Sequence, residues 1–172
     1  MKRIAALLLL ALSACSLQPL YSGGGAGPVA QGLHAVQLGP IPGRAGWLVR
    51  TALEDKMAPE GTNARYRLEV DLDDQIVGYG LRRTDDGITR QRRTLRARYR
   101  LVDASQGTVL LDATAGSDAS VDVVSSEYAT VAAEQTALEH LAQEVANQIV
   151  ARVALYISRT SRTASAGAGT GS

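Results

Sequence analysis

Few residues of this 172-residue chain could do chemistry, and the most unusual of them is its only cysteine, Cys15. A thiol acts as a nucleophile or a metal ligand only beside suitable partners, such as a histidine base. The two histidines, His34 and His140, lie far apart along the sequence on segments with different predicted structures. We therefore expect no nucleophile and base pair, no metal site and no bound cofactor, and an enzyme is not expected.

The residues before Cys15 explain the thiol better. Residues 1–14 have a basic start, an apolar run that ends at Leu12 and two small residues, which is the anatomy of a bacterial export signal. The apolar run is about half the roughly 20 residues that a helix needs to cross a bilayer. The order Leu-Ser-Ala-Cys resembles the lipobox of bacterial lipoproteins, so we expect cleavage before Cys15 and a covalent diacylglycerol and N-acyl chain on it. The alternative is an unpaired thiol that follows a signal by chance.

Acylation of Cys15 would fix the chain to a membrane, because each buried methylene contributes about 0.8 kcal/mol. The next residue is Ser16 rather than aspartate, which favours the outer membrane by resemblance to lipoprotein sorting. Glycines crowd residues 22–32, so residues 15–32 are expected to be an acylated N-terminus and flexible tether. Residues 160–172 are mostly Ser, Thr, Ala and Gly and predict a disordered tail.

The remaining residues, 33–159, are expected to form a single domain. Hydrophobic periodicity predicts the order β-α-β-β-β-α, with strands near 33–41, 66–73, 94–101 and 109–115 and helices over 43–57 and 127–159. Each helix has one apolar stripe, so we expect an α+β two-layer sandwich with both helices on one face of a four-stranded mixed sheet. The chain has no Phe, and Trp47 and a few Tyr are expected to be the largest core residues.

The second and third strands should form a hairpin. Asp86-Gly87 is a typical pair for a two-residue hairpin loop, and this loop would place Asp73 opposite Arg100 and Leu72 opposite Leu101. A slip by one residue would place apolar residues opposite arginine, so the register is well specified by the alternation.

The arginines of this hairpin form two groups. Arg96, Arg98 and Arg100 have acidic partners available on the neighbouring strand, so ordinary cross-strand pairing explains them. Toward the hairpin tip, five arginines face only Asp85 and Asp86; they are Arg82, Arg83, Arg90, Arg92 and Arg93. Unpaired guanidinium groups suit phosphate and carboxylate. An exported, lipid-anchored protein meets little nucleic acid, so an anionic glycolipid is the favoured ligand, and a tip that only improves solubility is the alternative.

Several short motifs resemble the lipopolysaccharide-assembly lipoprotein family LptE. They are Gln18-Pro19-Leu20-Tyr21, the stretch 43–50 with Leu53-Glu54-Asp55, Tyr66-Arg67-Leu68, and Tyr128 at the start of the last helix. The resemblance implies a β-α sandwich without enzymatic activity that binds lipopolysaccharide. It further implies a plug on the periplasmic side of the outer membrane, within a large β-barrel lipopolysaccharide translocon that it helps to assemble. No motif identifies the lipid-binding residues, so the tip arginines are candidates from charge alone.

Two other functions remain open at this point. Auxiliary lipoproteins of phospholipid ABC-type transport systems have small α/β domains of similar architecture. An envelope activator that contacts a peptidoglycan synthase across the periplasm would favour a longer tether, because residues 16–32 span at most about 60 Å when fully extended.

Overall fold

The computed structural model describes residues 27–59, 64–81 and 88–168. The predicted signal peptide, Cys15, Arg82 and Arg83 lie outside the described residues. In chain order the described elements are α2 (Pro28–His34), β1 (Val36–Leu38), α3 (Gly43–Met57), β2 (Tyr66–Leu81), β3 (Ile88–Asp103), β4 (Val109–Asp122) and α4 (Glu127–Ala168).

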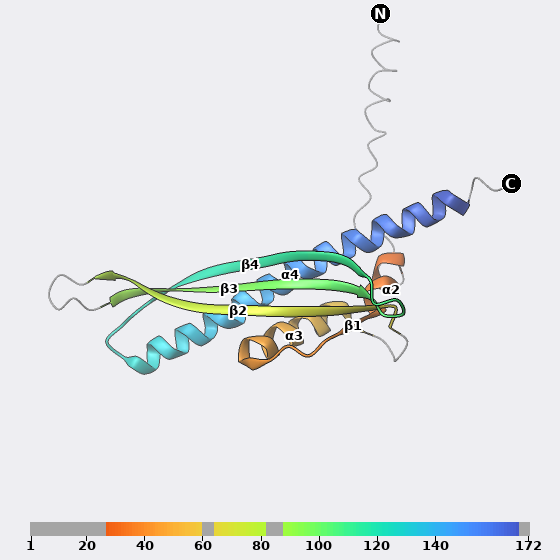
Figure 1. Ribbon diagram of the computed structural model, residues 1–172. Coiled ribbons are helices and arrows are strands. Elements are labelled where there is room, and N and C mark those ends of the chain that lie inside the picture. Colours follow the sequence, from red (N-terminus) through yellow and green to blue (C-terminus); the bar gives the residue numbers. More distant parts are fainter. Residues whose placement is uncertain (1–26, 60–63, 82–87, 169–172) are drawn as a thin grey trace, which may run out of the picture.

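The four strands form one mixed sheet in the order β1-β2-β3-β4. β1 is parallel to β2, and the other two pairings are antiparallel. Figure 1 shows the long helix α4 running along the sheet, with α3 beside it. The predicted α+β class and the order from β1 to α4 are confirmed, and α2 is an additional helix at the N-terminal side.

The helices bury one face of this sheet. Alternate residues of the central strand β3, including Leu95 and Leu101, are fully buried, as are Leu68 on β2 and Val145 and Ile149 on α4. This is the alternation that the sequence predicts for a half-covered sheet. Trp47 was expected in the core, but it is 64% exposed, because it lies on the outward side of α3 while Val49 and Leu53 point inward.

The predicted hairpin register is wrong, although the predicted faces are right. Asp73 lies opposite Arg96 rather than Arg100, and Leu72 lies opposite Ala97. The described pairing runs as far as Leu81 and Ile88, and Asp86-Gly87 lies outside the described residues. The displacement is an even number of residues, and each side chain therefore keeps its face.

Two segments expected to lack structure are helical. Pro28–His34 forms α2, which begins with proline at its first turn and buries Val29 and Leu33. Gly32 serves close packing rather than flexibility, because a Cβ atom there would collide with Cγ2 of Ile157 on α4. α4 continues past Arg159 to Ala168, and hydroxyls in this part, such as Thr163 Oγ1, donate to carbonyls of the preceding turn.

Candidate functional site

The face of the sheet away from the helices is rich in charge. We call it the outer face; on β3 it carries Arg90, Arg92, Thr94, Arg96, Arg98 and Arg100, which are exposed or half-buried. β2 and β4 place acidic residues on either side of this row, because both strands pair with β3 in antiparallel register. On the outer face a row of arginines on β3 therefore lies between two rows of carboxylates, one on β2 and one on β4.

Most of these arginines are paired within the sheet. Nitrogen-to-oxygen distances are 2.8 Å for Arg90 and Asp122, 3.7 Å for Arg92 and Asp118, 2.8 Å for Arg98 and Asp112, and 3.4 Å for Arg100 and Glu69. The hydrogen bond from Arg98 lowers the pKa of Asp112 below its ordinary value. All four pairs are exposed to solvent, and such pairs contribute about 0 to 1 kcal/mol each.

The expectation of unpaired arginines at the hairpin tip is therefore wrong for Arg90, Arg92 and Arg93. The charge count along the hairpin omitted the next strand, β4, which supplies Asp118 and Asp122. Since only the register shows which residues face each other, this pairing was not visible from local composition.

Arg93 differs from its neighbours because it points toward α4. Its Nε and Nη2 atoms donate to the two oxygens of Asp74 at 2.9 and 2.6 Å, and Nη1 donates to the carbonyl oxygen of Glu134 on α4 at 3.1 Å. Only 13% of the side chain is exposed. Arg93 thus joins β2, β3 and α4, which is a structural role.

The end of the sheet at Tyr79 and Arg90, which we call the distal end, combines cations with exposed apolar groups. On the outer face Val77 lies opposite Arg92 and Tyr79 lies opposite Arg90. The Arg92 guanidinium carbon lies 5.7 Å from the centre of the Tyr79 ring, a cation–π distance. Large exposed side chains continue around this end at Ile76, Ile88, Val124, Tyr128 and Val131. The apolar run from Ile76 to Tyr79 is the sequence signal that could have located this end.

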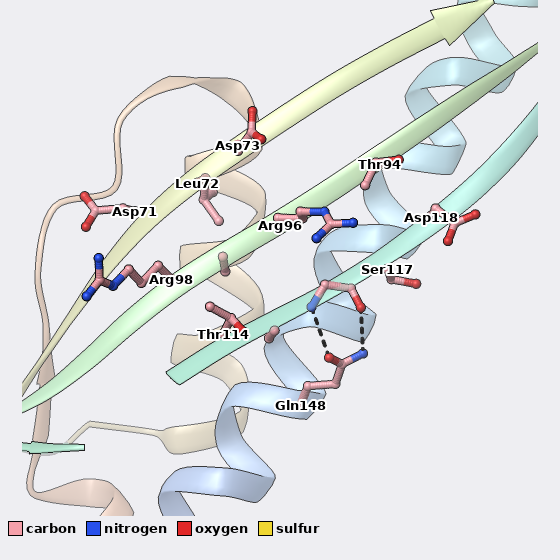
Figure 2. A pocket seen from close by; sticks show the side chains of 13 residues that line it. Asp71, Leu72, Asp73, Thr94, Arg96, Arg98, Thr114, Ser117, Asp118 and Gln148 are labelled. Carbon is pink, nitrogen blue, oxygen red and sulfur yellow. Dashed lines mark hydrogen bonds between the residues drawn. The ribbon is translucent and has the colours of Figure 1, made fainter. Parts of the chain in front are cut away.

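A hollow of about 560 Å³ lies farther along the outer face. Figure 2 shows Arg96 beside Thr94 within it, with Asp71 and Asp73 on one side and Asp118 on the other. Three strands contribute to the lining, which also includes Arg98, Thr114, Gly116 and Ser117, and Gln148 from α4. The sequence did not predict this hollow, because it depends on which residues the register brings together.

Arg96 has no ion pair in the part of the chain that the structure describes. Its neighbour on β2 is Asp73, whose two oxygens accept from Nε2 of Gln75 at 3.2 and 3.0 Å. Its neighbour on β4 is Gly116, which offers no side chain. A Cβ atom at Gly116 would lie 3.3 Å from Cγ of Arg96, so glycine makes room for the arginine.

Gln148 protects the edge of the sheet beside this hollow. β4 is an edge strand, and the backbone N–H and C=O of Gly116 both bond the Gln148 amide at 3.2 Å, as the dashed lines in Figure 2 mark. A side-chain amide offers the same donor and acceptor as a peptide group. Gln148 therefore takes the place of a neighbouring strand at this point of the edge.

Within residues 27–59, 64–81 and 88–168, no three His, Cys, Asp or Glu side chains lie close enough together to hold a metal ion. None of the helices described is both long and apolar enough to cross a membrane.

The fold and these surfaces define a two-layer α+β domain with a bare, charged sheet face. The family model for lipopolysaccharide assembly, LptE, matches residues 33–153, so the chain belongs to this family. The resemblance expected from the short motifs is confirmed.

Solved structures agree with this assignment. A lipoprotein candidate from Caulobacter crescentus is 25% identical, with a TM-score of 0.65, and the match covers 76% of this chain and 96% of that chain. A minor lipoprotein from Acinetobacter baumannii is 16% identical with a TM-score of 0.58, covering 70% and 90%. The rare lipoprotein B from Shewanella oneidensis is 9% identical with a TM-score of 0.51, covering 76% and 98%; these last two likenesses concern the fold alone. No curated protein matches the sequence.

Proposed function

We propose that this protein is the lipid-anchored partner of a large β-barrel lipopolysaccharide translocon in the outer membrane. It helps the barrel to assemble, plugs it from the periplasmic side and binds lipopolysaccharide during delivery to the cell surface. Membership of the lipopolysaccharide-assembly family supports the general role. The role is not enzymatic: it needs a rigid fold and complementary surfaces rather than reacting groups.

Acylation of Cys15 provides the anchor in this proposal. The described chain begins at Gly27 beside α2, at the end of the sheet opposite the distal end (Figure 1). β3 has 16 residues, and a strand of that length extends roughly 50 Å. The distal end therefore lies well away from Gly27, the first described residue on the anchored side, and can meet a ligand or the barrel wall.

The observation that carries lipopolysaccharide binding is the composition of the distal end. A phosphorylated amphiphile needs cations beside apolar surface, and Arg90 and Arg92 lie beside exposed Val77 and Tyr79. The carboxylates that pair with these arginines are exposed, so a phosphate can replace them at little cost. Arg82 and Arg83 remain candidates from the sequence. Arg93 is the weakest of the five, because its guanidinium is already bound on three sides.

Binding of lipopolysaccharide by the full mature lipoprotein in detergent tests this site. Replacing Arg90 and Arg92 together by glutamine should weaken binding about tenfold, which corresponds to about 1.4 kcal/mol. Arg100→Gln is the matched control, because Arg100 lies on the same strand and face and is also paired with a carboxylate. Equal binding by the double variant and the control would reject the distal end as the site.

The barrel partnership is tested in cells and in membranes. Co-purification from detergent-solubilised outer membrane should yield a stoichiometric large β-barrel protein. Depletion of the lipoprotein should reduce both the mature barrel and surface lipopolysaccharide. Normal levels of both after depletion would instead favour a role in phospholipid transport or in activating a peptidoglycan synthase.

A further inference from the structure

We propose that the hollow around Arg96 binds an anionic saccharide, with Arg96 holding its phosphate or carboxylate and the surrounding side chains bonding its hydroxyls. The inference rests on the proposed function, since it assigns the sugar part of the glycolipid to a second place on the outer face. It concerns residues different from those of the distal end.

We expect the ligand to carry an anionic group because of the surroundings of Arg96. Arg90, Arg92, Arg98 and Arg100 on the same face each have a carboxylate within 3.7 Å. Among the described residues Arg96 has none, although Asp71, Asp73 and Asp118 line the same hollow, and its neighbour on β4 is glycine, Gly116. A planar guanidinium group with free donors binds phosphate or carboxylate through two parallel hydrogen bonds. The hollow therefore contains one guanidinium group, a planar fork of donors, that can bind an anion through two hydrogen bonds.

The rest of the lining favours a sugar over a bare anion or an acidic protein surface. Asp71, Asp73 and Asp118 lie around the same hollow. Their carboxylates would repel further negative charge, but each can accept hydrogen bonds from hydroxyl groups. Thr94 and Thr114 can both donate and accept. A ring with many hydroxyls and a single acidic group satisfies both halves of this lining, whereas a surface with several carboxylates does not.

The dimensions fit a part of a larger ligand. The hollow of about 560 Å³ lies within the roughly 300 to 1,000 Å³ usual for small-molecule sites. Arg92 and Arg96 are four residues apart on one face of β3, which places them about 13 Å apart along the strand. One glycolipid could thus contact the distal end with its lipid part and the hollow with its saccharide.

The test uses the full mature lipoprotein and, as probe, the phosphorylated saccharide left after complete deacylation of lipopolysaccharide. Isothermal titration calorimetry should show binding to the unaltered protein and about tenfold weaker binding to Arg96→Gln. Arg96→Lys keeps the charge without the fork and should give an intermediate loss. Arg100→Gln, outside the hollow, should bind within about twofold of the unaltered protein.

Several results would overturn the inference. Absence of saccharide binding to the unaltered protein, while intact lipopolysaccharide still binds, would refute the hollow and leave the proposed function standing. If intact lipopolysaccharide also fails to bind, both the saccharide site in the hollow and lipopolysaccharide binding in the proposed function are refuted. Equal saccharide affinity of Arg96→Gln would reject the fork, and equal competition by inorganic phosphate would reject the sugar. Normal saccharide binding by Arg96→Gln with loss of barrel co-purification would assign Arg96 to a protein carboxylate instead.

Discussion

The contact between Arg93 and α4 gives the sharpest prediction for stability. Arg93 makes two hydrogen bonds to Asp74 and one to the carbonyl of Glu134, and both charged side chains are largely shielded from water. We predict that Arg93→Met loosens the start of α4 from the sheet. Methionine keeps most of the apolar stem and removes the three hydrogen bonds together with the charge.

The expected loss is about 2 kcal/mol in the free energy of unfolding, because hydrogen bonds to charged groups contribute about 1.5 to 3 kcal/mol and Asp74 is left unpaired. At about 2 to 4 °C per kcal/mol for a domain of this size, the melting temperature should fall by about 4 to 8 °C. The comparable pair of Arg100 and Glu69 is more exposed, so Arg100→Met should cost under about 0.5 kcal/mol.

Urea unfolding of Arg93→Met, Asp74→Asn and the double variant would measure the coupling between the two side chains. We expect a coupling energy of about 1 kcal/mol or more, since these residues touch, and faster amide exchange near the start of α4 in Arg93→Met. Additive losses, or a loss no larger than that of Arg100→Met, would refute a stabilising role for this contact.

Three further predictions concern other parts of the fold. Replacing Gly32 by alanine should lower the melting temperature, because its Cβ would collide with Ile157, at a cost of about 1 to 3 kcal/mol; unchanged melting would contradict that packing. Gln148→Ala should expose the edge of β4 and produce concentration-dependent dimers in light scattering, and a variant that stays monomeric at high concentration would refute the protective role. Hydrogen bonds from Ser105 lower the pKa of Asp103, so its stabilising contribution is present above the unfolded pKa of about 4 and is lost as pH falls through the folded value. The difference in urea midpoint between the unaltered protein and Asp103→Ala should therefore be larger at pH 7 than at pH 3, and an equal difference would contradict this.

Periodicity in the sequence was sufficient to predict the order of elements and the buried face. Alternation along 66–73 and 94–101 reflects burial directly, and so does the stripe of α4. Glycine was harder to interpret, because Gly32 can indicate a flexible chain or a close contact, and only Ile157 on a distant helix decides between them. α2 was missed for this reason.

Alternation alone could not predict which charged residues pair, because pairing depends on the strand register. Alternation fixes the face of a residue, but a shift of the register by an even number of residues changes every partner and no face. In the observed register Arg96, rather than the predicted Arg100, is the neighbour of Asp73, and β2 pairs with β3 farther toward the distal end than the sequence predicted. The prediction that arginines in the middle of the sheet are paired and those at its tip are unpaired depended on this register.

In the structure Arg98 and Arg100 are paired as predicted, whereas the predictions are wrong for the described tip arginines, which are paired, and for Arg96, which has no ion pair among the described residues. This difference separates two roles on one surface. Arg90 and Arg92 have exposed carboxylate partners, so an anion must compete for them, and neighbouring Val77 and Tyr79 would have to supply part of the affinity through apolar contact. Arg96 needs no such competition, because within the described part of the chain it has no ion-pair partner to displace. An acyl-bearing ligand should therefore depend mainly on the distal end, while a deacylated saccharide should depend mainly on Arg96, and the two sets of variants should separate these ligands.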